Sequence, residues 1–158
     1  MNPIKPLLCV ALSAACLSAH AHETHPRTAM TTAPTHTVES RFSFAQTVQR
    51  LHTAVTERGM TVFAVIDHQA AAQKDGLSMQ PDTVIVFGTP KAGTPLMVKD
   101  PAFALQLPLR VLVTETDGKV QVVYPSTRAL IQNSRIDYAD VENTLAKAET
   151  LIRNTVTQ

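Results

Sequence analysis

Two short stretches of the sequence carry residue types that take part in chemistry, and the first is Asp67-His68. The pair directly follows a run of β-branched and apolar residues. A His beside a carboxylate can act as a general base or a metal ligand, because the carboxylate orients the ring and raises its basicity. Adjacent residues of an extended chain point in opposite directions, which argues against a direct bond between the two side chains. The structural alternative is that Asp67 caps the following turn and His68 bonds to the backbone.

The second stretch, residues 90–97, is rich in Pro and Gly. Thr94 precedes a proline, which is typical of a helix N-cap followed by the first helical residue. Backbone N–H groups at such a helix start favour an anion, and Lys91 adds positive charge. The stretch lacks the spacing of a phosphate-binding P-loop, so a rigid connection is the alternative. Met97 and Met79 offer an apolar lining or soft sulfur ligands for copper(I).

The first residues of the chain predict export. A positive charge precedes the apolar run 7–17, and Ala19-His20-Ala21 is the small-x-small pattern that a signal peptidase accepts. We therefore expect residues 1–21 to be a signal peptide and the protein to be periplasmic or secreted. The apolar run is shorter than the about 20 residues that span a bilayer. An alternative, acylation of Cys16, is disfavoured by Ser13, because a large aliphatic residue is expected at that position.

Residues 22–40 are rich in Thr, Pro and His and poor in large apolar residues, which is typical of a flexible leader. Cleavage after residue 21 makes His22 the N-terminal residue. Its amine and imidazole, with the imidazole of His25, form a nitrogen-rich set that suits copper(II). The alternative is that these histidines are solvated side chains of the leader. Cleavage also removes both cysteines, so we expect no thiol chemistry in the mature chain.

The composition restricts the class of protein. The 14 Lys and Arg residues nearly balance the 13 Asp and Glu residues, for a net charge of +1. This balance argues against nucleic-acid binding through phosphates and against a polybasic membrane-surface protein. Aromatic residues are 4% of the chain, too few for a surface on which bases stack. With 44% hydrophobic residues among 158, the chain can form one domain with a core, and we expect no stable membrane span.

Local patterns predict the elements that position these residues, beginning with the first half of the domain. Ser43 and Gln46 match a capping box and open a helix over about 43–58. The continuous β-branched runs 61–66 and 83–87 predict strands, and the second should be central. A short helical turn is expected over 70–73. A further edge strand is expected near residues 35–42.

In the second half, Thr94 and Asp100 each precede a proline and predict two short helices. Strands 109–116 and 119–124 are joined by Asp117-Gly118, which is typical of a type I′ hairpin turn. Apolar residues at helical spacing predict a C-terminal amphipathic helix from residue 137 or 138 onward. These residues are Val141, Leu145, Ala148, Ile152 and Val156.

The order of elements predicts an α+β fold. We expect a single domain over residues 41–158, built as a two-layer sandwich in which an antiparallel sheet carries two long helices on one face. A Rossmann unit is excluded because no glycine-rich turn joins a strand to a helix.

Three stretches of the sequence resemble the signatures of a known family. Residues 65–72 (VIDHQAAA), 86–97 (VFGTPKAGTPLM) and 105–113 (LQLPLRVLV) look like those of the domain of unknown function 302 (DUF 302) family. The resemblance covers about 42–156. It implies a fold similar to half of the TATA-binding protein and a homodimer, and it implies no established activity. Thr114 stands where the family usually has an aromatic residue.

These observations favour a noncatalytic module that binds a small ligand or a metal ion. We expect the site in a cleft between the strand end at Asp67-His68 and the loop 91–97, in a homodimer. The first alternative is an enzyme in which His68 is the base and Lys91 stabilises an anionic intermediate. The second is a purely structural homodimer. The predicted ligand-binding residues are Asp67, His68, Lys91, Thr94 and Met97, and the predicted metal ligands, with copper as the candidate ion, are His22, His25 and His68.

Overall fold

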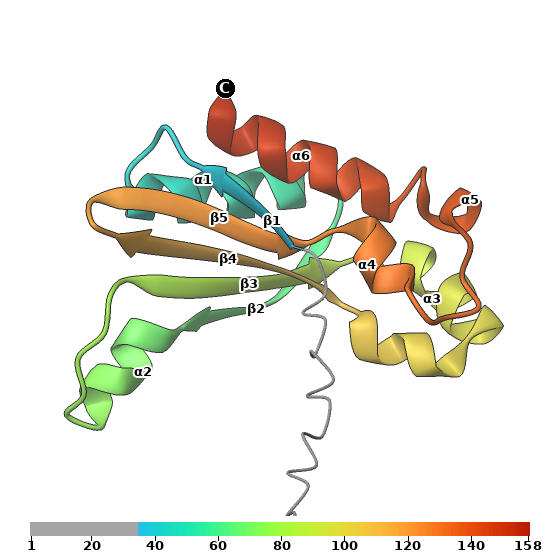
Figure 1. The fold of residues 1–158 in the computed structure, drawn as a ribbon, viewed down its shortest axis with the longest axis horizontal. Helices are drawn as coiled ribbons and strands as arrows, with labels where there is room; N and C mark the ends of the chain where they lie inside the picture. Colours follow the sequence, from blue (N-terminus) through green and yellow to red (C-terminus); the bar gives the residue numbers. More distant parts are fainter. Residues whose placement is uncertain (1–34) are drawn as a thin grey trace, which may run out of the picture. The chain divides into compact units, whose positions relative to one another are not determined.

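A computed structural model describes residues 35–158 of the chain (Figure 1). The predicted signal peptide and most of the predicted leader lie outside the described residues. The strands are β1 (Thr35–Glu39), β2 (Thr61–Asp67), β3 (Asp82–Gly88), β4 (Leu109–Thr116) and β5 (Lys119–Pro125). The helices are α1 (Phe44–Glu57), α2 (His68–Lys74), α3 (Pro90–Lys99), α4 (Thr127–Ile131), α5 (Tyr138–Val141) and α6 (Leu145–Thr157), and η1 (Pro101–Gln106) is a 3₁₀-helix.

The strands form one five-stranded sheet in the order β1-β5-β4-β3-β2, and every neighbouring pair is antiparallel. β4 and β5 make the predicted hairpin. Asp117 and Gly118 have φ angles of 54° and 73°, as a type I′ turn requires at both central positions. β3 is interior, as predicted, and β1 and β2 are the two edges.

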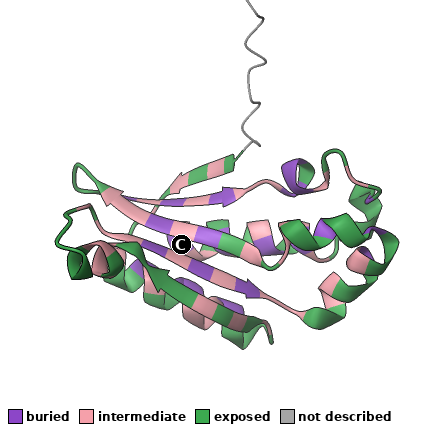
Figure 2. Ribbon diagram, turned by 90° about the horizontal axis from the view of Figure 1, so that it is seen from below, coloured by how far each residue is buried: buried purple, intermediate pink, exposed green. Residues whose placement is uncertain are grey.

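The main core lies between one face of the sheet and the helices α1 and α6, which run along the same side of it (Figure 1). In β3 and β5 every second residue is buried, because alternate side chains of a strand point to opposite faces (Figure 2). Leu51 and Val55 of α1 meet Ile152 and Val156 of α6 in this core. The predicted α+β architecture is therefore confirmed. Among the described residues, no helix is both long and apolar enough to cross a bilayer.

The first helix forms where its sequence predicts it. The Ser43 side chain accepts a hydrogen bond from the Gln46 N–H, and the Gln46 side chain accepts one from the Ser43 N–H, so the capping box is present. The helix is followed by Gly59, whose φ of 71° is accessible to glycine at little cost. The chain then turns directly into β2, which fixes where Met60 and Phe63 lie.

The predicted edge strand near residues 35–42 is present as β1. Since β1 pairs with β5 along its whole length, the last residues of the predicted leader belong to the sheet. The Ser40 and Thr47 hydroxyls lie 2.7 Å apart, and Thr47 is fully buried. These contacts tie the end of β1 to the first turns of α1.

A second, smaller core lies beyond the end of β3 and holds the short helices together. Its buried members come from α3, η1, α4, α5, α6 and the segment before α5. They are Leu96, Phe103, Leu130, Ile136, Val141 and Leu145. Asp100, itself 7% exposed, joins two parts of this region, because its carboxylate accepts from the N–H groups of Ala102 and Arg135 at 3.1 and 3.0 Å.

The predicted start of a helix at Thr94 is wrong. α3 begins at Pro90, after Thr89, and Pro95 lies inside the helix. Thr89-Pro90 has the same N-cap and first-residue pattern as the predicted pair. The N–H groups of Ala92 and Gly93 both donate to the Thr89 carbonyl, so the first turn closes there. Pro95 is the sixth residue of the helix and has no backbone N–H, so α3 lacks one helical hydrogen bond at that position.

The single C-terminal helix predicted from residue 137 or 138 is interrupted. α5 ends at Val141, and α6 begins at Leu145 after an irregular turn in which Thr144 has φ −127° and ψ −84°. The predicted buried stripe is nevertheless confirmed at all five positions. α4, capped by Ser126, was not predicted. The interruption matters because it places Asn143 and Thr144 at the cavity described next.

Candidate functional site

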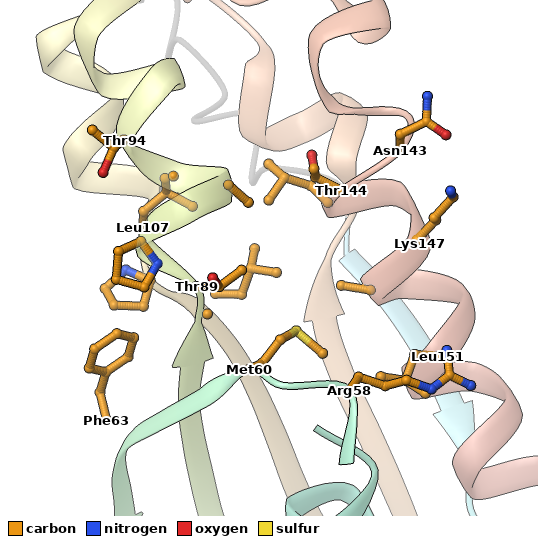
Figure 3. Close-up of a pocket in the computed structure, with 18 of the residues that line it drawn as sticks. Arg58, Met60, Phe63, Thr89, Thr94, Leu107, Asn143, Thr144, Lys147 and Leu151 are labelled. Carbon is orange, nitrogen blue, oxygen red and sulfur yellow. The ribbon is translucent and has the colours of Figure 1, made fainter. Parts of the chain in front are cut away.

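A pocket of about 400 Å³ opens at the end of the sheet where β3 ends and β4 begins (Figure 3). α3 and the segment before β4 form one side, and the first turns of α6 form the other. The 19 lining residues are Arg58, Met60, Phe63, Gly88, Thr89, Pro90, Ala92, Gly93, Thr94, Met97, Leu107, Pro108, Leu109, Asn143, Thr144, Leu145, Lys147, Ala148 and Leu151. Most of these side chains are apolar, and two are flexible methionines that adapt to the shape of a bound molecule.

The α3 side of the pocket depends on a close approach at Gly93. A Cβ atom at this position would lie 3.2 Å from Leu107 Cδ1 and 3.8 Å from Met97 Cε. Glycine therefore lets α3 pack directly against the segment that leads into β4. Phe63 lies on the same side of the pocket as Leu107 (Figure 3), and the residue is 52% exposed. A large apolar side chain this exposed at a concavity is typical of a binding surface.

The α6 side of the pocket follows from the interruption between α5 and α6. Asn143 and Thr144 lie in that turn, and Leu145 begins the helix. Lys147 and Leu151 are one helical turn apart, so both project from one face. This side supplies one amide, one hydroxyl and one ammonium group, and Figure 3 shows Asn143, Thr144, Lys147 and Leu151 along it.

The charged side chains in the lining are both cationic. They are Arg58, which follows α1, and Lys147 of α6, and both are exposed. Among the described lining residues none is Asp or Glu. Neither cation takes part in any ion pair within residues 35–158. In Figure 3 both lie on the α6 side, whereas Phe63 and Leu107 lie on the opposite side. The pocket therefore combines an apolar body with a positive rim.

The outer end of α3 is held by a charge cluster away from the pocket. Lys99 Nζ lies 3.1 Å from Asp137 Oδ2 and 2.5 Å from Asp140 Oδ2. These hydrogen bonds raise the pKa of the Lys99 amine above its usual value, and the bond from Lys99 lowers the pKa of the Asp140 carboxyl. The cluster links α3 to α5, the helix that precedes the interrupted turn.

Asp67 and His68 lie at the junction of β2 and α2. The Asp67 carboxylate accepts from the Ala70 N–H at 2.8 Å and caps α2. The His68 side chain is exposed. Asp67 therefore caps the turn that follows β2, as expected if its role is structural.

The predicted cleft between Asp67-His68 and residues 91–97 is wrong. In the register of β2 and β3, Asp67 pairs with Thr83, whereas Thr61 pairs with Gly88. The seven residues of β2 span about 20 Å, so the two stretches lie at opposite ends of the sheet, beside α2 and α3 respectively (Figure 1). His68 and Lys91 cannot act on a common atom, which removes the geometry of the predicted enzyme.

Of the five predicted ligand-binding residues, Thr94 and Met97 line the pocket. Lys91 is exposed on the first turn of α3 and is not part of the lining. Of the predicted metal ligands, His22 and His25 lie outside the described residues. Within residues 35–158, no group of three or more His, Cys, Asp or Glu side chains is arranged to hold a metal ion. A copper site remains a prediction.

Sequence reasoning missed the pocket residues outside α3, above all Arg58, Phe63 and Lys147. The available signals were weak. Lys147 and Leu151 share a helix face, and Phe63 is the aromatic side chain of β2. The stretches 86–97 and 105–113 that resemble a family contain 10 of the lining residues.

Comparisons with known proteins agree with this fold. The family model described as "Domain of unknown function DUF302" matches residues 36–152. A crystal structure of an uncharacterised conserved DUF302 protein from Bacillus stearothermophilus superposes with a TM-score of 0.64, covering 77% of this chain and 94% of that chain at 18% identity. At this identity the likeness concerns the fold alone.

Curated relatives match a smaller part of the chain. Proteins named fluoride-specific ion channel FluC 1 from Brucella suis and Brucella abortus are each 43% identical over 86 residues, which is 54% of this chain. The match covers 34% of the first relative and 32% of the second, so the chain spans about a third of the length of the curated relatives it matches. The shared segment thus also occurs within longer proteins.

Proposed function

This chain belongs to the DUF302 family, whose function is unknown, and we propose that it is a noncatalytic binding protein for a small, largely apolar ligand held in the pocket between α3 and α6. The observation that carries the proposal is the pocket itself. Its volume of about 400 Å³ and its mainly apolar lining fit the usual range for small-molecule sites, in which a few polar groups orient the ligand.

The side chains of the lining favour binding over catalysis. Among the described residues around the pocket there is no His, Cys, Asp or Glu, the types that most often serve as general base or nucleophile. The polar groups are threonines, one asparagine and two cations, all of which suit recognition of a ligand. His68, the predicted base, lies at the far end of β2.

A pocket-filling substitution tests the proposal. We expect the purified protein to bind the uncharged fluorophore N-phenyl-1-naphthylamine saturably, at one molecule per chain, with an increase in fluorescence. Met97→Trp should weaken this binding at least about tenfold, because an indole ring occupies space that the ligand needs. Titration of the fluorophore measures both.

Met79→Trp is the matched control, since Met79 is also partly buried but lies outside the pocket. It should bind the fluorophore as the wild type does. The proposal fails when the wild type shows no saturable binding, or when Met97→Trp and Met79→Trp bind equally well. Circular dichroism spectra of both variants check that the fold is retained.

We also propose that the chain forms a homodimer through the edge strand β2. The two edges of the sheet differ in character: β1 exposes Thr35, Thr37 and Glu39, whereas β2 exposes Phe63, Val65 and Ile66 at 52%, 48% and 42%. An apolar edge strand with unpaired backbone groups is a template for another strand. Two copies of β2 can pair antiparallel around a two-fold axis, which presents the same surface from each copy.

Native mass spectrometry tests this interface. The wild type should be a dimer, and Val65→Lys should be largely monomeric, because a charged side chain at a self-paired edge meets its own copy. Thr37→Lys on the opposite edge is the control and should remain dimeric. A monomeric wild type, or a dimeric Val65→Lys protein, contradicts the proposed interface.

We also propose that the chain is exported and that its mature N-terminus binds copper. We place the mature protein in the periplasm or outside the cell because of the signal-peptide pattern in residues 1–21. Mass spectrometry of the same protein under denaturing conditions should give the mass of a chain that begins at His22. A copper adduct in the native spectrum would support the site at His22 and His25, and a full-length chain would contradict both.

A further inference from the structure

We infer, as a step that rests on the proposed binding function, that the ligand is a single-chain amphipathic anion: an apolar body of medium length that carries one carboxylate. The proposed function requires only an apolar ligand. The inference adds the sign of the charge, the place of the charged group and the size of the apolar part.

The sign of the charge follows from the lining. Arg58 and Lys147 are positive, and no acidic side chain among the described lining residues offsets them. Within residues 35–158 the carboxylates that form ion pairs are paired with His36, Lys99 and Lys119. Arg58 and Lys147 thus remain available to a ligand. A cationic ligand would meet two like charges at the rim, which disfavours its binding.

The place of the charged group follows from the arrangement of the two walls. Arg58 and Lys147 are exposed, so a carboxylate beside them keeps part of its hydration and avoids the cost of full burial. Phe63, Leu107 and Thr94 lie on the opposite side of the pocket (Figure 3). An acyl chain that extends from the cations across the pocket would therefore meet the apolar side chains of Leu107 and Phe63.

The size of the apolar part follows from the volume. A pocket of 400 Å³ lies near the lower end of the range of about 300–1,000 Å³ that small-molecule sites span, which favours a ligand with a single chain. A medium-length fatty acid is such a ligand, and a lipid with two long chains is larger.

Three probes with a single alkyl chain of nine or ten carbons and different head groups test the inference. Decanoate, decanol and decyltrimethylammonium are titrated below their micelle concentrations against the full chain, with displacement of N-phenyl-1-naphthylamine as the readout. We expect decanoate to bind about tenfold more tightly than decanol, and the ammonium probe to bind most weakly. Added salt should weaken the binding of decanoate and leave that of decanol nearly unchanged.

Charge-removing variants locate the head group. Arg58→Gln with Lys147→Gln should raise the Kd for decanoate about five- to tenfold and change the Kd for decanol by less than about twofold. Lys74→Gln on α2, at the other end of the sheet, is the control and should change neither. Equal binding of decanoate and decanol, or no response of decanoate to the double variant, overturns the inference while the proposed function stands. Failure of all three probes to displace the fluorophore overturns the inference, and failure of the fluorophore itself to bind overturns the proposed function.

Discussion

Phe103→Ala should lower the free energy of unfolding by about 3–5 kcal/mol, the cost of removing a fully buried ring from a packed core. Phe103 lies in η1 and is 1% exposed. It packs in the second core, which joins α3 and η1 to α5 and α6. Of these helices, α3 and α6 form the two sides of the pocket. The loss has two sources. The variant no longer gains the free energy of burying the ring, and its folded state contains a cavity that the neighbouring side chains fill only partly.

Leu105→Ala is the matched control because Leu105 belongs to the same 3₁₀-helix but is 81% exposed. Its free energy of unfolding should stay within about 0.5 kcal/mol of the wild type. Urea titration followed by circular dichroism measures both variants. A loss below about 1 kcal/mol for Phe103→Ala would mean that the second core does not hold these helices together. A large loss for Leu105→Ala would mean that the exposed side of η1 is covered in solution.

Local physical chemistry explains which elements were predictable. A capping box satisfies two backbone N–H groups within four residues, so Ser43 and Gln46 specify the start of α1 without help from the rest of the fold. Asp117-Gly118 specifies the β4–β5 hairpin in the same way, because few residue pairs adopt positive φ at both positions. Each signal is complete within a few residues, and each was read correctly from the sequence.

Two helix boundaries were mispredicted because the local signal was ambiguous. Thr89-Pro90 and Thr94-Pro95 carry the same pattern, and in the structure the first turn closes at Thr89, whose carbonyl accepts from the Ala92 and Gly93 N–H groups. The break between Val141 and Leu145 contains neither Gly nor Pro. The buried stripe continues through it at helical spacing, so its periodicity gives no sign of the interruption. Neither boundary follows from the local sequence pattern alone.

The candidate site was misplaced for a topological reason. Placing Asp67-His68 and residues 91–97 in one cleft requires the end of β2 to lie beside the end of β3, which holds for parallel strands. β2 and β3 are antiparallel neighbours, so the end of each lies beside the start of the other. The sequence did predict an antiparallel sheet, and pairing these two strands within it would have separated the stretches. The residues that line the pocket together with α3 include Arg58 and Lys147. They are far from α3 in the sequence, so only the folded chain shows that they share one pocket with it.

Asp100→Ala should lower the free energy of unfolding by about 2–4 kcal/mol, because one buried carboxylate satisfies two backbone donors in different parts of the fold. One oxygen accepts from the Ala102 N–H and caps η1, and the other accepts from the Arg135 N–H. Loss of a helix cap costs about 1 kcal/mol. Loss of a hydrogen bond to a charged group costs about 1.5–3 kcal/mol more when its partner remains shielded from water.

Two comparisons separate these contributions. Asp67→Ala removes a cap of the same kind from α2, but Asp67 is exposed and accepts from Ala70 alone, so the loss should be about 1 kcal/mol. Asp100→Asn keeps the size of the side chain and one acceptor oxygen, and its NH₂ group must face the other N–H. Its stability should therefore fall between those of the wild type and Asp100→Ala. Equal losses for Asp100→Ala and Asp67→Ala would show that the bond to Arg135 contributes nothing. The bond closes a loop of 35 residues between α3 and α5, so its removal should also loosen the turn at residues 142–144 and weaken fluorophore binding at urea concentrations where the wild type still binds.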